Sequence, residues 1–141
     1  MEPLDLAALP EGGLVLVDAA PIIYVLEGHA KYAVRFRPLF ERQAAGSIVF
    51  AVATTTIAEV LAGPFAAGEE ALAKRYRNVM ETWQVVPLTA DIAESAARLR
   101  ATLKLKLPDA IQVASAIAVN ADALVTHDRD FAKVSALPIL S

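Results

Sequence analysis

The sequence contains no cysteine among its 141 residues. This absence excludes disulfide bonds and zinc sites built from thiolates, and it fits a protein that works in a reducing interior. No apolar run reaches the roughly 20 residues that a membrane-spanning helix needs. The first residues, Met1 to Asp5, also lack the basic start typical of a secretion signal. We therefore expect a cytoplasmic protein that makes no contact with a membrane.

Charged residues are scarce as well, at 21% of the chain, and the net charge is -3. This charge argues against a protein that coats nucleic acid through bulk attraction, although it leaves room for a local binding site. The hydrophobic fraction is 56%. We therefore expect some apolar surface that is covered by a partner or by a second copy of the chain.

The chain length suits one domain, and the sequence shows no internal repeat or linker. Residues 1–13 contain two prolines and two glycines with little periodicity, which predicts an N-terminal tail or strap before a domain at 14–141. Within that domain, short apolar runs alternate with helical patterns. The segments predicted as strands are 14–17, 48–52, 84–87, 123–126 and 137–140. This alternation predicts an α/β fold in which a central parallel sheet of about four or five strands is flanked by helices on both faces.

Residues that commonly begin or end helices predict where several helices start and stop. Thr56 is predicted to cap a short helix at 57–61 that stops at Gly63. Thr89 is predicted to cap a helix at 90–103, and Pro108 to lie in the first turn of a helix that runs to about residue 121.

Four acidic residues stand where apolar strands end or helices begin: Asp18, Glu59, Asp109 and Asp128. In an open α/β sheet, such positions gather beyond the carboxyl ends of the strands. Carboxylates this close together repel one another unless they share protons or bind a cation. Oxygen ligands without cysteine favour Mg²⁺ or Mn²⁺. The pattern therefore predicts a metal-dependent phosphodiesterase.

Each of these acids also has a local explanation. Asp18 is a suitable N-cap, Glu59 matches a capping box with Thr56, Asp109 suits the positive end of a helix dipole, and Asp128 could be a turn residue. Taken together, these explanations require four unrelated caps and turns to fall at the same edge of the sheet.

Four segments carry a resemblance to a known family. They read VDAAPIIYVLEG at 17–28, TTTIAEV at 54–60, LKLPDA at 105–110 and LVTHDRDF at 124–131. In this order they resemble the motifs of PIN-domain proteins, and the chain looks like the toxin of a VapBC-type toxin–antitoxin pair. The resemblance implies an endoribonuclease that depends on Mg²⁺ or Mn²⁺, cleaves RNA, forms a homodimer and is held in check by a small antitoxin.

By position, Asp18, Glu59, Asp109 and Asp128 match the acidic quartet of the family, with Asp130 as an alternative to Asp128. The three aspartates of this match, Asp18, Asp109 and Asp128, would hold one or two metal ions. Glu59 would bind a second ion or orient the attacking water. Thr126 matches a hydroxyl position that supports the site.

One departure from the family pattern is Ala19-Ala20, where many members carry a polar residue after the first aspartate. Loss of that hydrogen bond would loosen Asp18. The alternative function is therefore a catalytically degenerate domain that binds RNA or another protein.

The aromatic residues are expected to be too dispersed to form a surface for base stacking. Trp83 is expected in the core or at an interface, and His29 at a solvated helix end. Strand alternation predicts that His127 points away from the side of Asp128.

Overall fold

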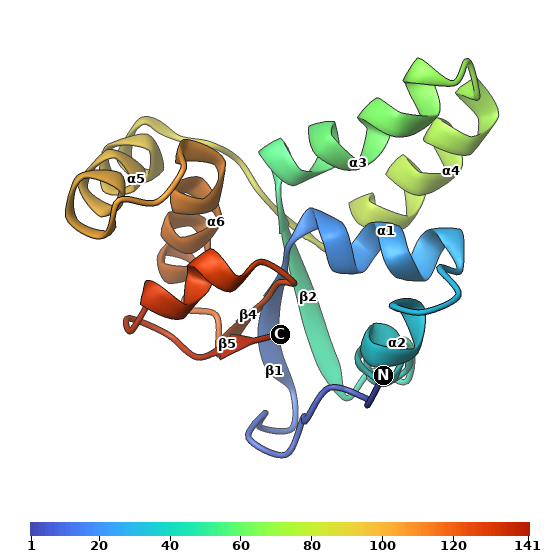
Figure 1. The fold of residues 1–141 in the computed structure, drawn as a ribbon, viewed down its shortest axis with the longest axis horizontal. Helices are drawn as coiled ribbons and strands as arrows, with labels where there is room; N and C mark the ends of the chain where they lie inside the picture. Colours follow the sequence, from blue (N-terminus) through green and yellow to red (C-terminus); the bar gives the residue numbers. More distant parts are fainter.

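The computed structural model describes all 141 residues, and it places five parallel strands between layers of helices (Figure 1). The strands lie in the order β3-β2-β1-β4-β5. Their bounds are β1 Gly13–Val17, β2 Ile48–Ala53, β3 Gln84–Val86, β4 Ala123–Val125 and β5 Ile139–Leu140. The helices are α1 Ala19–Glu27, α2 Ala33–Ala44, α3 Thr54–Ala66, α4 Glu70–Glu81, α5 Ala90–Leu103 and α6 Leu107–Ala118, with a 3₁₀ helix η1 at Arg129–Lys133. The predicted α/β class with a parallel sheet is confirmed.

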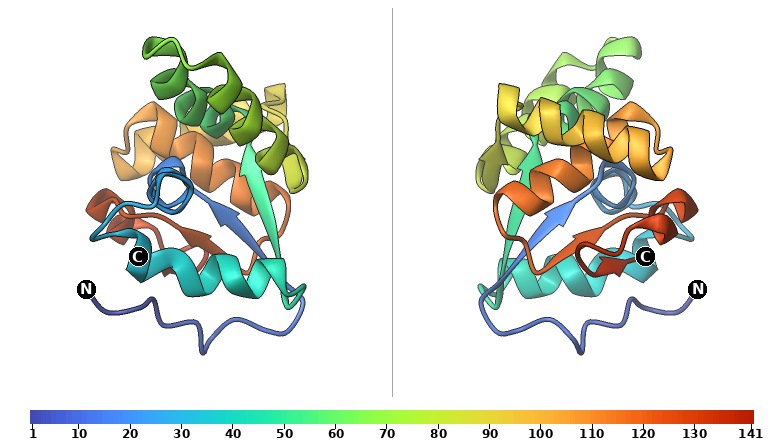
Figure 2. Two further views of the ribbon diagram at one scale, coloured as in Figure 1. Left: turned by 90° about the vertical axis from the view of Figure 1, so that its right-hand side faces the viewer. Right: turned by 90° about the vertical axis from the view of Figure 1, so that its left-hand side faces the viewer.

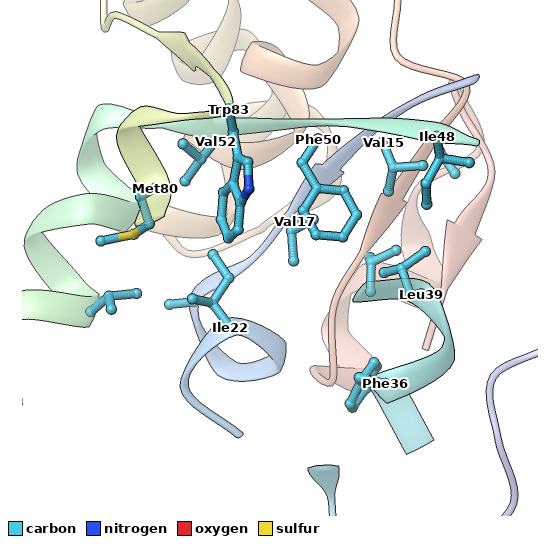
Figure 3. Close-up of a cluster of buried hydrophobic side chains, with 14 of the residues drawn as sticks. Val15, Val17, Ile22, Phe36, Leu39, Ile48, Phe50, Val52, Met80 and Trp83 are labelled. Carbon is cyan, nitrogen blue, oxygen red and sulfur yellow. The ribbon is translucent and has the colours of Figure 1, made fainter. Parts of the chain in front are cut away.

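The central strands are apolar throughout because both faces of the sheet are buried. Alternate side chains of β1 point to opposite faces, so that Val15 and Val17 join one core cluster and Leu16 joins the other. Helices α1 and α2 cover the first face, and α5 and α6 cover the second (Figure 1). Figure 3 shows the first cluster, in which Phe50 and Trp83 project toward the side chains of the covering helices.

Trp83 lies in this core, as expected, and is 8% exposed. Its ring packs edge-to-face against Phe50, with ring centroids 5.1 Å apart.

No helix of the protein is both long enough and apolar enough to cross a bilayer.

Helix α3 differs most from its prediction. It begins at Thr54, directly after β2, and continues past Gly63 and Pro64 to Ala66. Thr56 is therefore not a cap, and no side chain caps this helix. The two helices α3 and α4 form a hairpin (Figure 1) in which Pro64 is buried. Packing in this hairpin outweighs the local preference of glycine and proline to end a helix.

Other helix ends follow the local signals. The Thr89 hydroxyl accepts a hydrogen bond from the Ile92 backbone N–H, which confirms the predicted cap of α5. Helix α1 ends at Gly28, whose left-handed backbone (φ 66°) glycine adopts without strain. Pro108 lies in the first turn of α6, as predicted, but α6 ends at Ala118 rather than near residue 121.

The N-terminal segment contains no helix or strand before β1 begins at Gly13. It runs beneath α2 (Figure 2), where Leu4 and Leu9 are buried and the Leu4 N–H donates to the Arg35 carbonyl. These contacts attach the segment to the domain. The division into a strap at 1–13 and a domain at 14–141 stays a prediction.

Candidate functional site

The carboxyl ends of three neighbouring strands meet at one edge of the sheet, because β1 lies between β2 and β4. Asp18 follows β1 directly, Asp128 follows β4, and Glu59 lies on α3 just after β2. Asp109 reaches the same edge from the first turn of α6. All four side chains line one pocket of about 540 Å³. The four acids are therefore brought together, although their catalytic and metal-binding roles stay predictions.

Asp18 is the most firmly held of the four. Its Oδ1 accepts hydrogen bonds from the Ala19 N–H (2.8 Å) and from Gln112 Nε2 (3.2 Å), and its Oδ2 accepts one from the Thr126 hydroxyl (2.9 Å). It caps α1 as well as facing the pocket. The expectation that Ala19-Ala20 would loosen Asp18 is wrong, because donors from two distant elements replace the missing one.

Gln112 was missed at the sequence level. It is 1% exposed and donates to the Thr56 hydroxyl as well as to Asp18, so that one amide joins α6 to α3 and to the end of β1. The spacing between Asp109 and Gln112 is the feature of the sequence that indicates a shared position at the site. Residues three apart share a helix face, and Gln112 is a polar residue between the apolar residues Ile111 and Val113 of α6.

The side chain of Glu59 makes no hydrogen bond within the chain and is exposed toward the pocket. The capping-box interpretation is wrong, because α3 begins at Thr54 and thereby places Glu59 beyond the first turn. Partial burial raises the pKa of Glu59, and the nearby charges of Asp18 and Asp109 raise it further.

Asp109 has the most perturbed titration in the pocket. Burial, followed by the charges of Asp128, Asp18 and Asp130, raises its pKa from 3.8 to about 6, while Lys106 acts in the opposite direction. Its Oδ2 is buried and has no hydrogen-bond partner. Carboxylate oxygens of Asp109, Asp128 and Asp130 lie within 4.8 Å of one another.

Asp128 lines the pocket and Asp130 does not, yet both lie close to Asp109. The choice between them as the fourth acid therefore stays open. The turn interpretation of Asp128 also holds, because its Oδ1 accepts from the Asp130 N–H (2.9 Å) at the start of η1.

No salt bridge neutralises this acidic cluster. The two ion pairs of the chain, Arg77–Glu81 and Arg98–Glu94, are exposed i,i+4 pairs on α4 and α5. Arg129 is the one basic residue that lines the pocket. An unpaired buried carboxylate oxygen beside several others is the donor set that a hard divalent cation requires, so the residues present fit Mg²⁺ or Mn²⁺.

An aromatic rim adjoins the acids, and we define it as Tyr24, His29, Tyr32 and His127. The Tyr24 ring lies 4.9 Å from Tyr32 and 5.4 Å from His127, measured between centroids. The Tyr24 hydroxyl and His127 Nδ1 are hydrogen-bonded at 3.0 Å. Burial, together with the charges of Arg35 and Arg129, lowers the pKa of His127, which keeps its ring neutral at pH 7.

The aromatic rim contradicts two predictions from the sequence. The tyrosines of α1 and of the α1–α2 connection are not dispersed, and His127 lines the same pocket as Asp128. Because Thr126 and His127 lie beyond the last residue of β4, strand alternation does not apply to them.

Comparisons with known proteins find relatives that share this fold. The PIN domain family model matches residues 15–137. A chain of a toxin–antitoxin complex from Klebsiella pneumoniae is 28% identical, with a TM-score of 0.69 over 87% of this chain and 94% of that one. A search of curated proteins found no match.

Two further solved structures share the fold at lower identity. VapBC2 from Rickettsia felis, bound to a DNA fragment from its promoter, is 17% identical, with a TM-score of 0.71 over 89% of this chain and 96% of that one. VapC20 from Mycobacterium tuberculosis, a toxin that cleaves the sarcin–ricin loop, is 15% identical, with a TM-score of 0.69 over 84% and 92%.

The Thr126 hydroxyl serves both Asp18 and the Asp128 N–H, from which it accepts a hydrogen bond at 3.1 Å. Thr126→Val removes both bonds at a fully buried position, so we expect the free energy of unfolding to fall by about 1–3 kcal/mol. Thr126→Ser keeps the hydroxyl and loses one methyl group, at a cost of under about 1 kcal/mol. Urea unfolding at pH 7 in EDTA measures both. A valine variant as stable as the serine variant would contradict the role of the hydroxyl.

The raised pKa of Asp109 predicts a pH dependence of stability without metal. Between pH 3.8 and about 6 the folded protein keeps a proton that the unfolded chain releases, so the free energy of unfolding falls as the pH rises through this window. Asp109→Asn should make this slope shallower. At pH 7 it should stabilise the protein by about 1–2 kcal/mol, after allowance for solvent screening.

Urea unfolding in EDTA across pH 4 to 7 tests this expectation. Glu41→Gln, which removes an exposed acid on α2, serves as the control and should keep the slope of the parent protein. An asparagine variant with the parent's slope would contradict the raised pKa of Asp109, and one that is strongly destabilised would show that Asp109 plays a structural role.

Proposed function

This chain belongs to the PIN-domain family, and from that premise we propose that it is a metal-dependent endoribonuclease and the toxin of a toxin–antitoxin pair. One observation carries the proposal. Carboxylates from four separate segments line one pocket without a cationic partner sufficient to balance them. Repulsion within such a cluster would only destabilise the fold if its role were purely structural, whereas a nuclease uses the carboxylates to bind metal ions.

The structural neighbours support the substrate and the partner. The similar chain from Klebsiella pneumoniae comes from a toxin–antitoxin complex, and VapC20 is a toxin that cleaves the sarcin–ricin loop. We therefore propose RNA as the substrate and a small antitoxin as the partner. Exposed apolar side chains such as Phe65, Leu88 and Leu107, at 44–51% exposure, suit a surface that a second copy or an antitoxin covers. On this proposal the protein acts as a homodimer in the cytoplasm, and its nuclease domain spans residues 14–141.

In this proposal Asp18, Asp109 and Asp128 hold one or two Mg²⁺ or Mn²⁺ ions, and Glu59 binds a second ion or orients water. Asp130 is the alternative to Asp128. A bound divalent ion lowers the pKa of water and neutralises charge on the phosphate.

The side chains around the acids have separate tasks. Gln112 and Thr126 fix the orientation of Asp18. Glu59, which has no hydrogen bond of its own and a raised pKa, is suited to take the proton of the attacking water. Arg129 is placed to contact a phosphate oxygen. As water adds to phosphorus, the bond to the 3′ oxygen breaks and that oxygen takes up a proton from solvent water, which leaves a 3′-hydroxyl and a 5′-phosphate.

The rival proposal was a degenerate domain without catalysis, and it depended on a loosened Asp18. Because three hydrogen bonds hold Asp18, no observation now favours that alternative over the nuclease.

Asp18→Asn tests the proposal most simply. The substitution removes a charge that the metal needs, and we expect the cleavage rate of single-stranded RNA in Mn²⁺ to fall by at least about 100-fold. EDTA should abolish cleavage by the parent protein, and Glu41→Gln should cleave at the parent's rate. Gel analysis of labelled RNA measures all three.

Equal rates for the asparagine variant and the parent protein would refute a role for Asp18 in catalysis. Cleavage that continues unchanged in EDTA would refute the metal dependence.

A further inference from the structure

The aromatic rim lies on top of the core and not within it. Phe36, whose ring is fully buried, lies beneath the rim with its centroid 6.1 Å from Tyr24 and 5.7 Å from His127. Tyr24, Tyr32 and His127 are partly exposed, and His29 is exposed. The other aromatic pairs of the protein lie around Phe50 and Trp83 in the core. The rim is thus an aromatic surface that solvent reaches.

The rim is continuous with the acidic pocket. Tyr24 and His127 line that pocket together with Asp18 and Asp128. Because His127 and Asp128 are consecutive residues, their Cα atoms are about 3.8 Å apart. His29 and Tyr32 do not line the pocket, but Tyr32 contacts Tyr24, and the His29 and Tyr32 rings form a nearly parallel pair, with centroids 4.9 Å apart and ring planes at 23°. A molecule bound at the acids would therefore meet flat rings immediately beside them.

Two basic side chains lie near the aromatic rim or the pocket beside it. The Lys31 ammonium lies 5.2 Å from the centre of the Tyr32 ring, and Arg129 lines the pocket. Partly exposed rings beside cations are the features that bind unpaired nucleotides, since bases stack on the rings while cations meet the phosphates.

We propose that the aromatic rim is a base-binding subsite, in which a nucleobase next to the cleaved phosphate of single-stranded RNA stacks on the rings of Tyr24 and Tyr32. The position of this base relative to the cleaved bond rests on the proposed nuclease function. Every base offers a flat face, so the subsite accepts any sequence. It selects unpaired RNA, because a base within a duplex cannot leave its stack without cost.

The rim also has a structural role that an experiment must separate from base binding. The Tyr24–His127 hydrogen bond ties α1 to the segment after β4, and His29 Nδ1 accepts from the Lys31 and Tyr32 N–H groups. The hydroxyl of Tyr32, by contrast, makes no hydrogen bond within the chain. Tyr32→Leu therefore removes the aromatic face and keeps apolar bulk, while Tyr32→Phe keeps the face.

The probe is a set of short single-stranded RNAs, each with the fluorescent base 2-aminopurine at a different position. Stacking on an aromatic ring quenches this fluorescence. Binding is measured on mixing with protein in Mn²⁺, and cleavage of the same RNAs is followed in parallel. Tyr24→Leu and Tyr24→Phe form a second pair of variants, and Glu41→Gln, which changes an exposed side chain of α2 that does not line the acidic pocket, is the control. Thermal melting establishes that each variant is folded.

We expect the parent protein to quench 2-aminopurine beside the cleaved bond and to leave a duplex of the same sequence unquenched. Tyr32→Leu should lose the quenching and weaken RNA binding by about 5-fold or more, as the loss of a base-stacking ring does. Tyr32→Phe and Glu41→Gln should behave as the parent does.

Cleavage without quenching at any position, or a Tyr32→Leu variant that binds and quenches as the parent does, would overturn the subsite and leave the nuclease proposal intact. Quenching that depends on Tyr32 without cleavage would support the subsite and count against the nuclease. Absence of both would contradict both proposals.

Discussion

Electrostatic repulsion among Asp18, Asp109 and Asp128 is the constraint around which the rest of this structure is arranged. The fold brings their carboxylates to one edge of the sheet and supplies no salt bridge to balance them. Two features of the structure reduce the repulsion among these carboxylates. Hydrogen bonds hold Asp18, and the raised pKa of Asp109 lets that group keep a proton up to about pH 6. A divalent cation is a third means, and the unpaired Oδ2 of Asp109 fits it.

The remainder of the fold supplies the rigidity that this arrangement needs. Strand β1 is buried on both faces and lies between β2 and β4, so the residue that follows it cannot move without disturbing two core clusters. Gln112 and Thr56 then join α6 and α3 beneath Asp18 through buried side chains. Polar contacts inside an apolar environment are costly to leave unmade. These buried contacts therefore fix Asp18 in position, whereas the side chain of Glu59 makes no hydrogen bond within the chain.

The sequence was sufficient to predict the parallel sheet and the gathering of the acids, because both follow from where apolar runs stop. It was insufficient where partners are distant along the chain. Thr56 meets Gln112 across 56 positions, and Tyr24 meets His127 across 103. Neither pair leaves a local pattern, and for this reason the sequence alone predicts a cap at Thr56 and dispersed tyrosines. The length of α3 was missed for a related reason, since packing in the α3–α4 hairpin overrides the signals of Gly63 and Pro64.

The central claim, that the acids form a cation site in which Asp109 is partly protonated, is tested most directly by calorimetric titration of Mn²⁺ at pH 6 in two buffers with different ionisation enthalpies. We predict saturable binding whose heat differs between the buffers, because the ion displaces a proton that Asp109 holds at its pKa of about 6. The difference should vanish at pH 8, where Asp109 is already ionised. No binding, or the same heat in both buffers at pH 6, would contradict the claim.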